Sequence, residues 1–463
     1  MAKKAKTVFV CQECGYESPK WMGQCICGAW NSFVEEAVKD FPEDDRRRGS
    51  AAASGRNVKA VSLPQVVSGQ SSRMDTGIKE LNRVLGGGLV KGSLTLISGE
   101  PGIGKSTIII QAAAGISQNY GKVLYVSGEE SEEQIRMRAD RVCKGDLGNI
   151  FLLSETNMEA VMTAVENEKP AFLVVDSIQT MYTESVESAP GSVSQVRACG
   201  NLLMNLGKSS GLPIFIVAHV TKSGELAGPK IVEHLVDTVL QFSGERNQDL
   251  RILRSFKNRF GTTSEIGAFE MREEGLAEIE NLSGSFLEGL QNATEGAIAT
   301  AVYEGTRPLL LEVQALTSPC GAGFARRTSI GIDNARLSMI VAVLERKAGL
   351  PLSMRDIYVN IVGGLKPEGT STDLAAALAI WSNEKGFSVP SDTLAIGEIG
   401  LTGELRPVMN ADKLIKEAGR MGFKNVIMPK RSAEKMRTLT EGLNVLGVRS
   451  VSEAIKALAA LHR

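Results

Sequence analysis

The central part of the sequence predicts a doubly wound α/β fold built on a parallel sheet. Short apolar runs bounded by turn residues alternate with helix-length segments from Val61 to about Gly289. Continuous apolar runs are typical of strands buried on both faces, as in parallel sheets covered by helices. The four clearest runs are LTLIS (94–98), KVLYVS (122–127), FLVVDS (172–177) and PIFIVAH (213–219).

Length and composition predict several globular domains. A chain of 463 residues is too long for one ordinary domain, and its 43% hydrophobic residues exclude a wholly disordered chain. The 52 Lys and Arg residues balance 53 Asp and Glu residues, so any nucleic-acid surface must be local. Aromatic residues make up only 5% of the chain, which disfavours base stacking as the main mode of binding.

Shifts in composition divide the chain. We expect a cysteine-bearing head at 1–34, a linker at 35–60, the α/β domain at 61–289 and a third domain at 293–463. The linker combines charged and small residues without apolar periodicity. After residue 293 the pattern changes to mixed strands and helices with many glycines, which indicates an α+β domain.

We expect no membrane segment. The basic N-terminus precedes only a short apolar stretch, and the longest apolar runs, such as LAAALAIW (374–381), are far shorter than the ~18 residues that a span requires. Four of the seven cysteines cluster within 11–27, which favours a reducing compartment over a disulfide framework. The sequence therefore predicts a cytoplasmic protein.

The motif GEPGIGKS (99–106) fits the phosphate-binding pattern G-x4-G-K-[ST] without a mismatch. It lies between the strand LTLIS and a helical run, where backbone N–H groups and the helix dipole can hold a phosphate. Lys105 would bridge the β- and γ-phosphates, and the Ser106 hydroxyl would bind Mg²⁺. The alternative is a glycine-rich turn that binds nothing. The expected nucleotide-binding residues are Gly99, Glu100, Pro101, Gly102, Ile103, Gly104, Lys105, Ser106 and Thr107.

Carboxylates follow two further predicted strands. Asp176 closes the strand FLVVD, where it can hold the Mg²⁺ shell and complete the nucleotide site. Glu129 and Glu130 follow the strand KVLYVS, and we expect one of them, Glu129 ahead of Glu130, to orient the attacking water. The alternative is an acidic pair that only stabilises the start of the next helix.

These motifs together resemble the RadA/Sms family of bacterial DNA-repair ATPases, over essentially all 463 residues. The order of phosphate loop, GEES, aspartate strand and PIFIVAHVTKSG is that of the RecA/DnaB-like core. The resemblance implies a RecA-like ATPase core with ATP and Mg²⁺, an N-terminal zinc ribbon and a Lon-protease-like C-terminal domain. The stretches that carry it are CQECGYESPKW, LNRVLGGGLVKGSLTLISGEPGIGKST, YVSGEES, VVDSIQT, GSVSQVR, AHVTKSGELAGPK and, most specific of all, KNRFG (257–261).

The KNRFG motif places two basic residues at one strand end. Lys257 and Arg259 alternate after the apolar strand LRILRSF, so both can project from it. The resemblance implies that they are catalytic fingers that reach the γ-phosphate of the neighbouring subunit, where they would stabilise phosphoryl charge. The alternative is a solvated basic strand end.

Other residues near this core are candidates for contact with DNA. His219 ends the strand PIFIVAH and is either a sensor that links the γ-phosphate to DNA-binding loops or a hydrogen-bonded core residue. Basic residues close by could bind the DNA backbone without reading sequence, or could be solvated charges. These are Lys222, Lys230, Arg251 and Arg254.

The head resembles a four-thiolate zinc ribbon. Cys11 and Cys14 form one knuckle, and Cys25 and Cys27 form the other after a gap of ten residues. Zn²⁺ prefers four thiolates in a tetrahedron, and so small a segment would depend on the metal to fold. The second knuckle, CICG, is one residue shorter than the usual CPxCG of the family. Four reduced cysteines without metal are the alternative.

The C-terminal stretch resembles a Lon protease domain that lacks its catalytic dyad. Ser371 falls at the position of the nucleophile, but the position of the dyad lysine falls on Asp412, with Lys413 beside it. An aspartate cannot supply a neutral amine, and a shift of one residue on a helix turns a side chain by about 100°. We expect a non-proteolytic scaffold in which AAALAI and LIKEAGRMG form packed helices.

The implied function is that of a ring-forming, DNA-stimulated ATPase. It would act as a helicase-like motor on recombination intermediates and extend the branches that RecA forms during DNA repair. Its partners would be single-stranded and branched DNA, RecA, and copies of itself in a homo-hexamer. Two alternatives remain open: a non-motor regulatory ring like the KaiC clock proteins, and an ATP-dependent protease like Lon.

Overall fold

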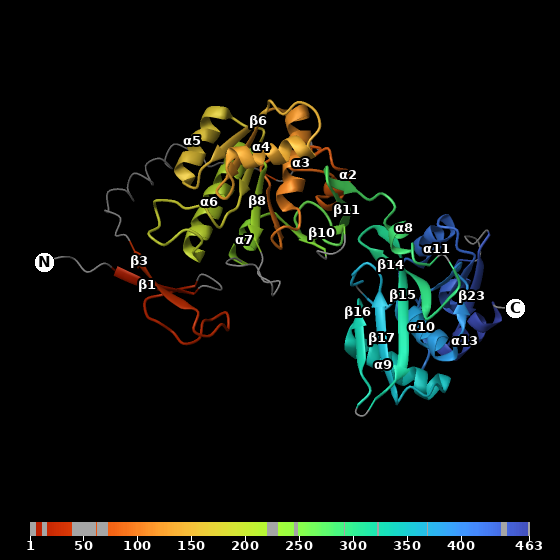
Figure 1. Ribbon diagram of the computed structural model, residues 1–463. Coiled ribbons are helices and arrows are strands. Elements are labelled where there is room, and N and C mark those ends of the chain that lie inside the picture. Colours follow the sequence, from red (N-terminus) through yellow and green to blue (C-terminus); the bar gives the residue numbers. More distant parts are fainter. Residues whose placement is uncertain are drawn as a thin grey trace. The chain divides into compact units, whose positions relative to one another are not determined.

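A computed structural model describes most of the chain. The described residues are 6–11, 16–38, 62, 73–219, 230–244, 249–290, 292–321, 324–367, 369–436 and 442–461. They belong to two compact units, Met1–Glu278 and Ile279–Arg463 (Figure 1). Within these ranges no helix is long and apolar enough to cross a membrane.

A nine-stranded sheet forms the centre of the first unit, in the order β12-β11-β10-β9-β4-β8-β7-β5-β6. From β9 to β6 all neighbours are parallel, as the apolar runs predict. The sequence pattern also predicts β10, but not the antiparallel extension that β10, β11 and β12 form beside β9. The strands are β4 (Leu94–Gly99), β5 (Val123–Ser127), β6 (Ile150–Ser154), β7 (Phe172–Asp176), β8 (Ile214–His219), β9 (Thr238–Ser243), β10 (Leu250–Asn258), β11 (Ile266–Arg272) and β12 (Gly275–Glu278).

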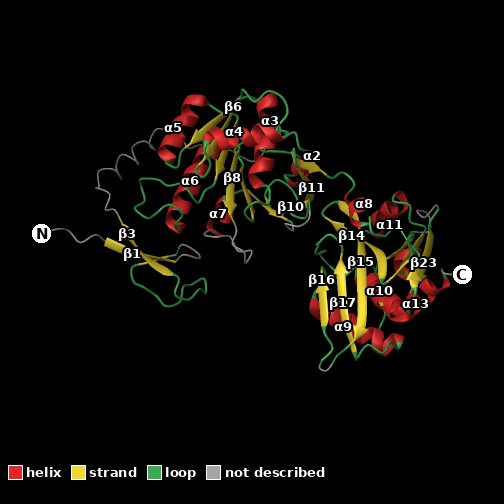
Figure 2. Ribbon diagram, viewed as in Figure 1, coloured by secondary structure: helices red, strands yellow, loops and turns green. Residues whose placement is uncertain are grey.

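Helices cover both faces of this sheet, which confirms the doubly wound prediction (Figure 2). Three of them pack with one apolar cluster: α2 (Lys79–Val84), α3 (Lys105–Tyr120) and α4 (Glu132–Val142). The other three pack with a second cluster on the opposite face: α5 (Met158–Glu168), α6 (Val193–Ser210) and α7 (Lys230–Leu235). In β4, β5, β7, β8 and β9 the side chains alternate between the two clusters, so these strands are buried on both sides.

Polar caps fix where the helices of the first unit begin. The Ser131 hydroxyl accepts a hydrogen bond from the backbone N–H of Gln134, and the Gln134 side-chain oxygen accepts one from the backbone N–H of Ser131. These two bonds form a capping box at the start of α4. Asn157 caps α5 and Ser192 caps α6 in the same manner, through a side-chain oxygen. Helix α3 differs because the residue before its first turn is a glycine of the phosphate loop, Gly104, which has no side chain to cap the helix.

The N-terminal head is a small three-stranded antiparallel sheet in the order β2-β1-β3. Its strands are β1 (Lys6–Cys11), β2 (Glu17–Ser18) and β3 (Phe33–Val38). A small cluster holds it together, in which Cys11, Cys25 and Phe33 are buried. So small an apolar core leaves most of the stability to other interactions.

A seven-stranded mixed sheet forms the second unit, in the order β16-β17-β15-β14-β19-β22-β23. Its strands are β14 (Ala297–Glu304), β15 (Arg307–Pro319), β16 (Arg327–Ile330), β17 (Arg355–Ile361), β19 (Thr393–Ala395), β22 (Asn425–Pro429) and β23 (Asn444–Val448). Two short pairs flank it: β13 (Thr294–Glu295) with β18 (Ser388–Val389), and β20 (Glu398–Ile399) with β21 (Leu405–Arg406).

The helices of the second unit lie on both faces of its sheet. Helix α10 (Asp373–Lys385) contacts β14 and β15 and packs with α9 (Asn334–Ala348) and α13 (Val451–Ala460). On the other face, α8 (Leu282–Phe286) and α11 (Ala411–Arg420) contact β15, and α12 (Lys430–Glu434) contacts β22 and β23. The AAALAI segment lies in α10, and LIKEAGRMG lies in α11 up to Arg420, so both form packed helices as the sequence predicts.

Candidate nucleotide-binding site

The phosphate-binding motif forms the turn between β4 and α3. Strand β4 ends at Gly99 and α3 begins at Lys105, so the helix N-terminus faces the loop. Gly104 has φ +115°, and a Cβ there would lie 2.8 Å from the Met271 side chain. The positive φ is the constraint that favours glycine here, because the Met271 methyl group is the end of a flexible side chain. Gly102 also has a positive φ, +79°, and a Cβ there would meet no atom within 4 Å.

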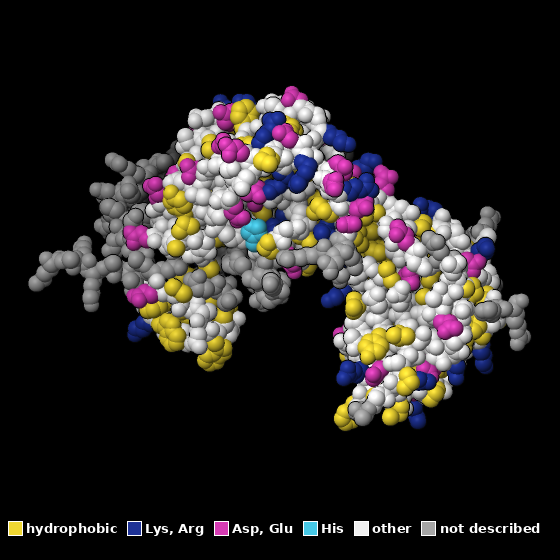
Figure 3. Space-filling view, in the orientation of Figure 1, with side chains coloured by type: hydrophobic (Ala, Val, Ile, Leu, Met, Phe, Trp, Pro, Cys, Tyr) yellow, Lys and Arg dark blue, Asp and Glu magenta, His cyan; other side chains and the backbone are white. Residues whose placement is uncertain are grey.

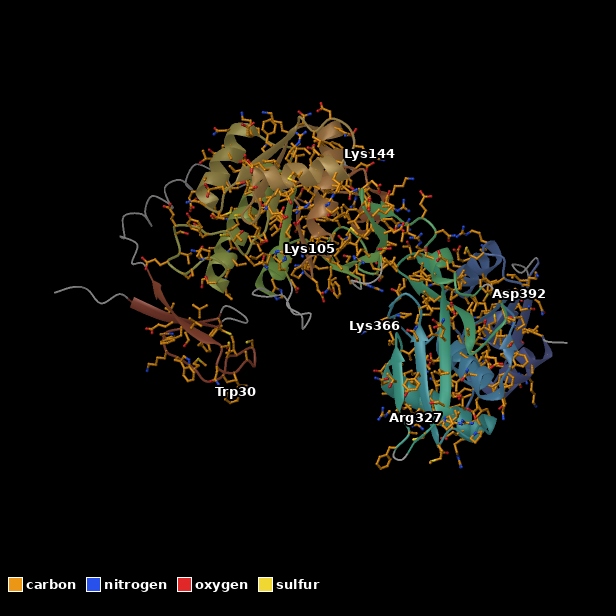
Figure 4. All side chains as sticks on the ribbon, in the orientation of Figure 1. Trp30, Lys105, Lys144, Arg327, Lys366 and Asp392 are labelled. Carbon is orange, nitrogen blue, oxygen red and sulfur yellow. The ribbon has the colours of Figure 1, made fainter. Side chains whose placement is uncertain are left out.

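Lys105 is a buried cation inside this turn (Figure 4). Its Nζ donates hydrogen bonds to the carbonyl oxygens of Gly99 (2.8 Å) and Glu100 (3.0 Å). Burial lowers the pKa of the Lys105 amine to about 8, while the carboxylates of Asp176 and Glu129 raise it. A buried ammonium group is stabilised by an anion beside it, so the residues fit a bound phosphate.

Asp176 is nearly buried and accepts two hydrogen bonds at one oxygen. Its Oδ2 receives the Ser106 hydroxyl at 2.8 Å and the Tyr125 hydroxyl at 2.7 Å. Burial, with Asp176 beside it, raises the pKa of Tyr125 well above its ordinary value, so the phenol stays protonated and donates. Ser106 and Asp176, both predicted as Mg²⁺ ligands, therefore lie together, and their hydroxyl and carboxylate oxygens are donors that Mg²⁺ accepts.

The two glutamates of the GEES stretch have different partners. Strand β5 ends at Ser127, whose hydroxyl accepts the backbone N–H of Glu130 at 2.9 Å. The Glu130 carboxylate then pairs with Arg138 on α4. Glu129 instead accepts a hydrogen bond from the Ser177 hydroxyl and lies close enough to Lys105 to affect its pKa. Glu129 is thus the glutamate that faces the nucleotide site.

His219 contacts the same glutamate. Its Nε2 lies 3.2 Å from Oε1 of Glu129, the oxygen that also accepts the Ser177 hydroxyl. The His219 carbonyl accepts a hydrogen bond from the Gln179 side chain at 3.4 Å. The ring Nδ1 is buried and has no hydrogen-bond partner among the described residues. The final residue of β8 is therefore connected to the carboxylate of Glu129.

Sequence reasoning missed Tyr125 and Ser177. Tyr125 is a polar-tipped aromatic residue within an apolar strand, and β5 pairs directly with β7, so its hydroxyl can reach the strand end. Ser177 immediately follows Asp176 and lies opposite the GEES turn, where the backbone N–H of Gly128 donates to the Asp176 carbonyl at 2.9 Å. Pairing of the two strands was the missing information in both cases.

Lys257 and Arg259 lie away from the phosphate loop of their own chain, toward the opposite end of the strands. Lys257 is in register with Val239 on β9, and Val239 is in register with Leu96 on β4. Because β10 is antiparallel to β9 and therefore to β4, residues after Lys257 lie progressively farther from the level of Gly99. Gly99 is three residues after Leu96 on β4, which is about 10 Å along the strand.

Both basic residues are held at that end of the strands. The Lys257 Nζ donates to the carbonyl of Glu233 at 2.7 Å, and Arg259 pairs with the buried Asp237 at 3.2 Å. Burial, and then the Arg259 cation, lowers the pKa of Lys257. The Arg259 side chain is 57% exposed and keeps donors available at the surface. Asp237 also pairs with Lys208 and accepts the backbone N–H of Leu94.

The other candidates for DNA contact are only partly described. Lys222 lies outside the described residues, as does the side chain of Lys230. Arg251 is only 6% exposed, so it is a poor candidate for contact with DNA. Arg254 is partly exposed on β10.

Three cysteines of the head form a thiolate cluster. The sulfurs of Cys11, Cys25 and Cys27 all lie within 4.8 Å of one another, and those of Cys11 and Cys27 are 3.9 Å apart. Four thiolates around zinc, each at ~2.3 Å, are about 3.8 Å apart, so the three described sulfurs fit the metal. Cys14 lies outside the described residues. The shortened knuckle turns at Gly28, whose φ is +92°, and still brings both of its sulfurs to Cys11.

The C-terminal unit shows no Ser–Lys pair at the position of the protease dyad among the described residues. The Lys413 Nζ donates to the Tyr303 hydroxyl at 2.8 Å and lies 4.9 Å from the centre of that ring. This hydrogen bond raises the pKa of Lys413, whereas a lysine that activates a serine needs a lowered pKa. Lys413 therefore remains a surface cation.

Three family models match parts of the chain: an AAA domain at 61–225, subunit ChlI of Mg-chelatase at 327–432, and a rubredoxin metal binding domain at 9–35. With the strand order and the phosphate loop, they define a P-loop ATPase with a RecA-like core. A zinc-ribbon-type head precedes this core, and a ChlI- and Lon-like domain follows it.

Relatives match the whole chain. It is 48% identical to the DNA repair protein RadA of Bacillus subtilis (strain 168), over 98% of both chains. It is 47% identical to the DNA repair protein RadA of Streptococcus pyogenes serotype M6, over 99% of this chain and 100% of that one. The chain therefore belongs to the RadA family, and the predicted resemblance is confirmed.

Two solved structures match about half of the chain. A KaiC-like protein of Pyrococcus horikoshii OT3 is 19% identical with a TM-score of 0.39, and it covers 45% of this chain and 99% of its own. The RadB recombinase is 22% identical with a TM-score of 0.37, and it covers 45% of this chain and 100% of its own.

We expect Tyr125→Phe to raise the Mg²⁺ concentration needed for half-maximal ATP hydrolysis about tenfold, because Asp176 would lose the hydrogen bond that orients its carboxylate toward the metal. Titration of Mg²⁺ at saturating ATP measures it, and nucleotide binding without Mg²⁺ should not change. Tyr120→Phe is the matched control, because the Tyr120 hydroxyl bonds the backbone of Asp75 at the far end of α3. An unaltered Mg²⁺ requirement in Tyr125→Phe would contradict the assigned contact.

Proposed function

We propose that this chain is a DNA-dependent ATPase that acts as a helicase-like motor in DNA repair. It would process recombination intermediates and promote branch migration of the strand-exchange products made by RecA. The proposal is supported above all by the convergence of Lys105, Ser106, Asp176 and Glu129 at the carboxyl ends of the parallel strands. The names of the full-length relatives support the role in DNA repair.

Within this site each residue would have a distinct task. Bound ATP and Mg²⁺ would supply the phosphoryl group and the metal that neutralises its charge. Lys105 would hold the β- and γ-phosphates, and Ser106 and Asp176 would bind the metal. Glu129 would orient the attacking water and accept its proton. The contacts of Ser177 and His219 both use Oε1 of Glu129, which leaves Oε2 to face the water.

Lys257 and Arg259 would act across a subunit interface. Their position toward the far end of the strands keeps them from the phosphates of their own chain, so we propose that they reach those of a neighbour in a homo-hexameric ring. An arginine supplied in this way stabilises charge on the transferred phosphoryl group. Hydrolysis would then depend on assembly.

DNA would be bound by local surfaces, since the whole chain has a net charge of only −1. We propose single-stranded and branched DNA as ligands and RecA as a partner, in the cytoplasm. His219 would connect Glu129 to the segment that follows β8, and a contact between that segment and DNA would stimulate hydrolysis. The C-terminal unit would serve assembly rather than proteolysis, in agreement with the raised pKa of Lys413.

The proposal is tested by ATP hydrolysis with and without single-stranded DNA, combined with the particle mass. We expect stimulation by DNA and a particle of six chains, and Lys105→Ala should abolish turnover because it removes the phosphate-binding cation. Strand displacement on forked DNA then tests the motor. An assembled ring whose ATPase ignores DNA would instead support a regulatory ring of the KaiC type, and a DNA-independent monomer would overturn both.

Mixing two inactive variants tests whether Lys257 and Arg259 act on the ATP site of a neighbouring subunit. Lys257→Ala and Arg259→Ala should each lose ATP turnover and keep nucleotide binding, as should Glu129→Gln. A mixture of Arg259→Ala with Glu129→Gln should regain part of the activity, because one variant supplies the finger and the other the intact site. Lys208→Ala is the matched control, since Lys208 pairs with the same Asp237 at 2.6 Å. A mixture that stays inactive, in rings shown to exchange subunits, would argue against action between subunits.

We expect the head to bind one zinc ion per chain, measured by elemental analysis of the purified protein. Cys27→Ser should lose the metal, because its sulfur is one of the three that converge. Cys320→Ser, a change to a cysteine of the C-terminal unit, should retain it. Wild-type protein without zinc would show that the shortened knuckle does not bind the metal.

A further inference from the structure

The described helices of the second unit leave part of one face of its sheet uncovered. On β15 the even-numbered residues share that face, and helices cover it at Leu310, which packs with α11. Further along, Gln314 and Leu316 are exposed and lie opposite Asn360 and Tyr358 of β17. The edge strand β16 extends this face with Thr328 and Ile330, opposite the same two β17 residues.

Large apolar side chains are exposed on this face. Leu316 is 56% exposed, Ile330 54% and Tyr358 38%, on three adjacent strands. Figure 3 shows hydrophobic side chains gathered on the side of this unit where Figure 1 draws β15, β16 and β17. Contiguous apolar groups of this kind on a soluble protein are typical of an interaction surface.

A pocket of about 430 Å³ opens where the covering layer ends. The exposed face residues line one part of it, and Gly289, Thr294, Glu295 and Gly296 line another. None of the described residues that line the pocket is Lys, Arg or His, whereas two of them, Glu295 and Glu312, are acidic. The lining therefore favours a cationic ligand over a phosphate or a nucleic acid.

Glu312 is the buried acid of this pocket. It is only 2% exposed, and its Oε1 accepts a hydrogen bond from the Gln314 side chain at 2.8 Å. Its Oε2 is buried and has no hydrogen-bond partner among the described residues. Gly289 lies against that oxygen so closely that a Cβ there would be 2.9 Å from it. A buried carboxylate oxygen without a donor is costly, and a donor in the pocket would relieve that cost.

We propose that this pocket binds the basic side chain of a protein segment, an Arg or Lys flanked by apolar residues. The guanidinium or ammonium group would donate to Glu312. Its aliphatic stem would lie against Leu316 and Tyr358, because long basic side chains place their methylene groups on apolar surfaces. The apolar neighbours of the segment would cover Ile330. This binding is independent of the proposed motor, because the pocket residues all belong to the C-terminal unit.

Calorimetry with the full-length protein tests the proposal. The probes are acetyl-Leu-Arg-Val-amide and its neutral counterpart acetyl-Leu-Gln-Val-amide. We expect the Arg peptide to bind at least about tenfold more tightly, because its guanidinium is a charged donor to the carboxylate, whereas the Gln amide is a neutral one. Equal affinities for the two peptides, or no binding of the Arg peptide at millimolar concentration, would overturn the proposal.

Two variants assign the binding to the pocket. Glu312→Gln keeps the shape of the side chain and should reduce affinity for the Arg peptide about tenfold, with little effect on the Gln peptide. Leu316→Lys places a positive charge, like that of the Arg peptide, at an exposed position where folding is not at risk. Repulsion between the two charges should abolish binding. Leu401→Lys is the matched control, since Leu401 is 70% exposed in the same unit outside the pocket. Unchanged affinity in Glu312→Gln or Leu316→Lys would place the peptide elsewhere and refute the assignment.

Discussion

The nucleotide site depends on one carboxylate oxygen, Oδ2 of Asp176. Strand β8 lies between β4 and β7, so no backbone hydrogen bonds join the strand of the phosphate loop to the strand of Asp176. The Ser106 hydroxyl spans that gap from the first turn of α3, and the Tyr125 hydroxyl reaches the same oxygen from β5. Three elements, α3, β5 and β7, thereby meet at a single atom, and the Asp176 carboxylate lies close enough to Lys105 to raise its pKa.

Much of this arrangement could be predicted from the sequence. Parallel strands bring their carboxyl ends to one edge of a sheet, so residues that follow apolar runs, such as Ser106 and Asp176, were expected to meet. The antiparallel extension was harder to predict. Strands β11 and β12 contain polar residues and glycines, such as Glu270 and Gly275, and lack the continuous apolar runs of the parallel strands. Tyr125 and Ser177 needed the strand pairing, which periodicity does not supply.

Residues that are neighbours in the sequence have different charged partners in the structure. Glu129 and Glu130 are adjacent, yet Arg138 neutralises one and leaves the other near Lys105. In the C-terminal unit, Lys413 has its pKa raised by Tyr303, while the buried Lys105 has its pKa lowered to about 8. The same type of side chain is thus an exposed cation in one unit and a buried amine with a lowered pKa in the other.

The antiparallel course of β10 has a consequence for the chain in the cell. It carries Arg259 toward the end of the strands that is remote from Gly99, and the buried Asp237 holds it there. Under the proposed mechanism a solitary chain could retain ATP but could not hydrolyse it. Activity would then rise more steeply than the number of molecules, so dispersed chains would stay idle and consumption of ATP would begin only where they gather.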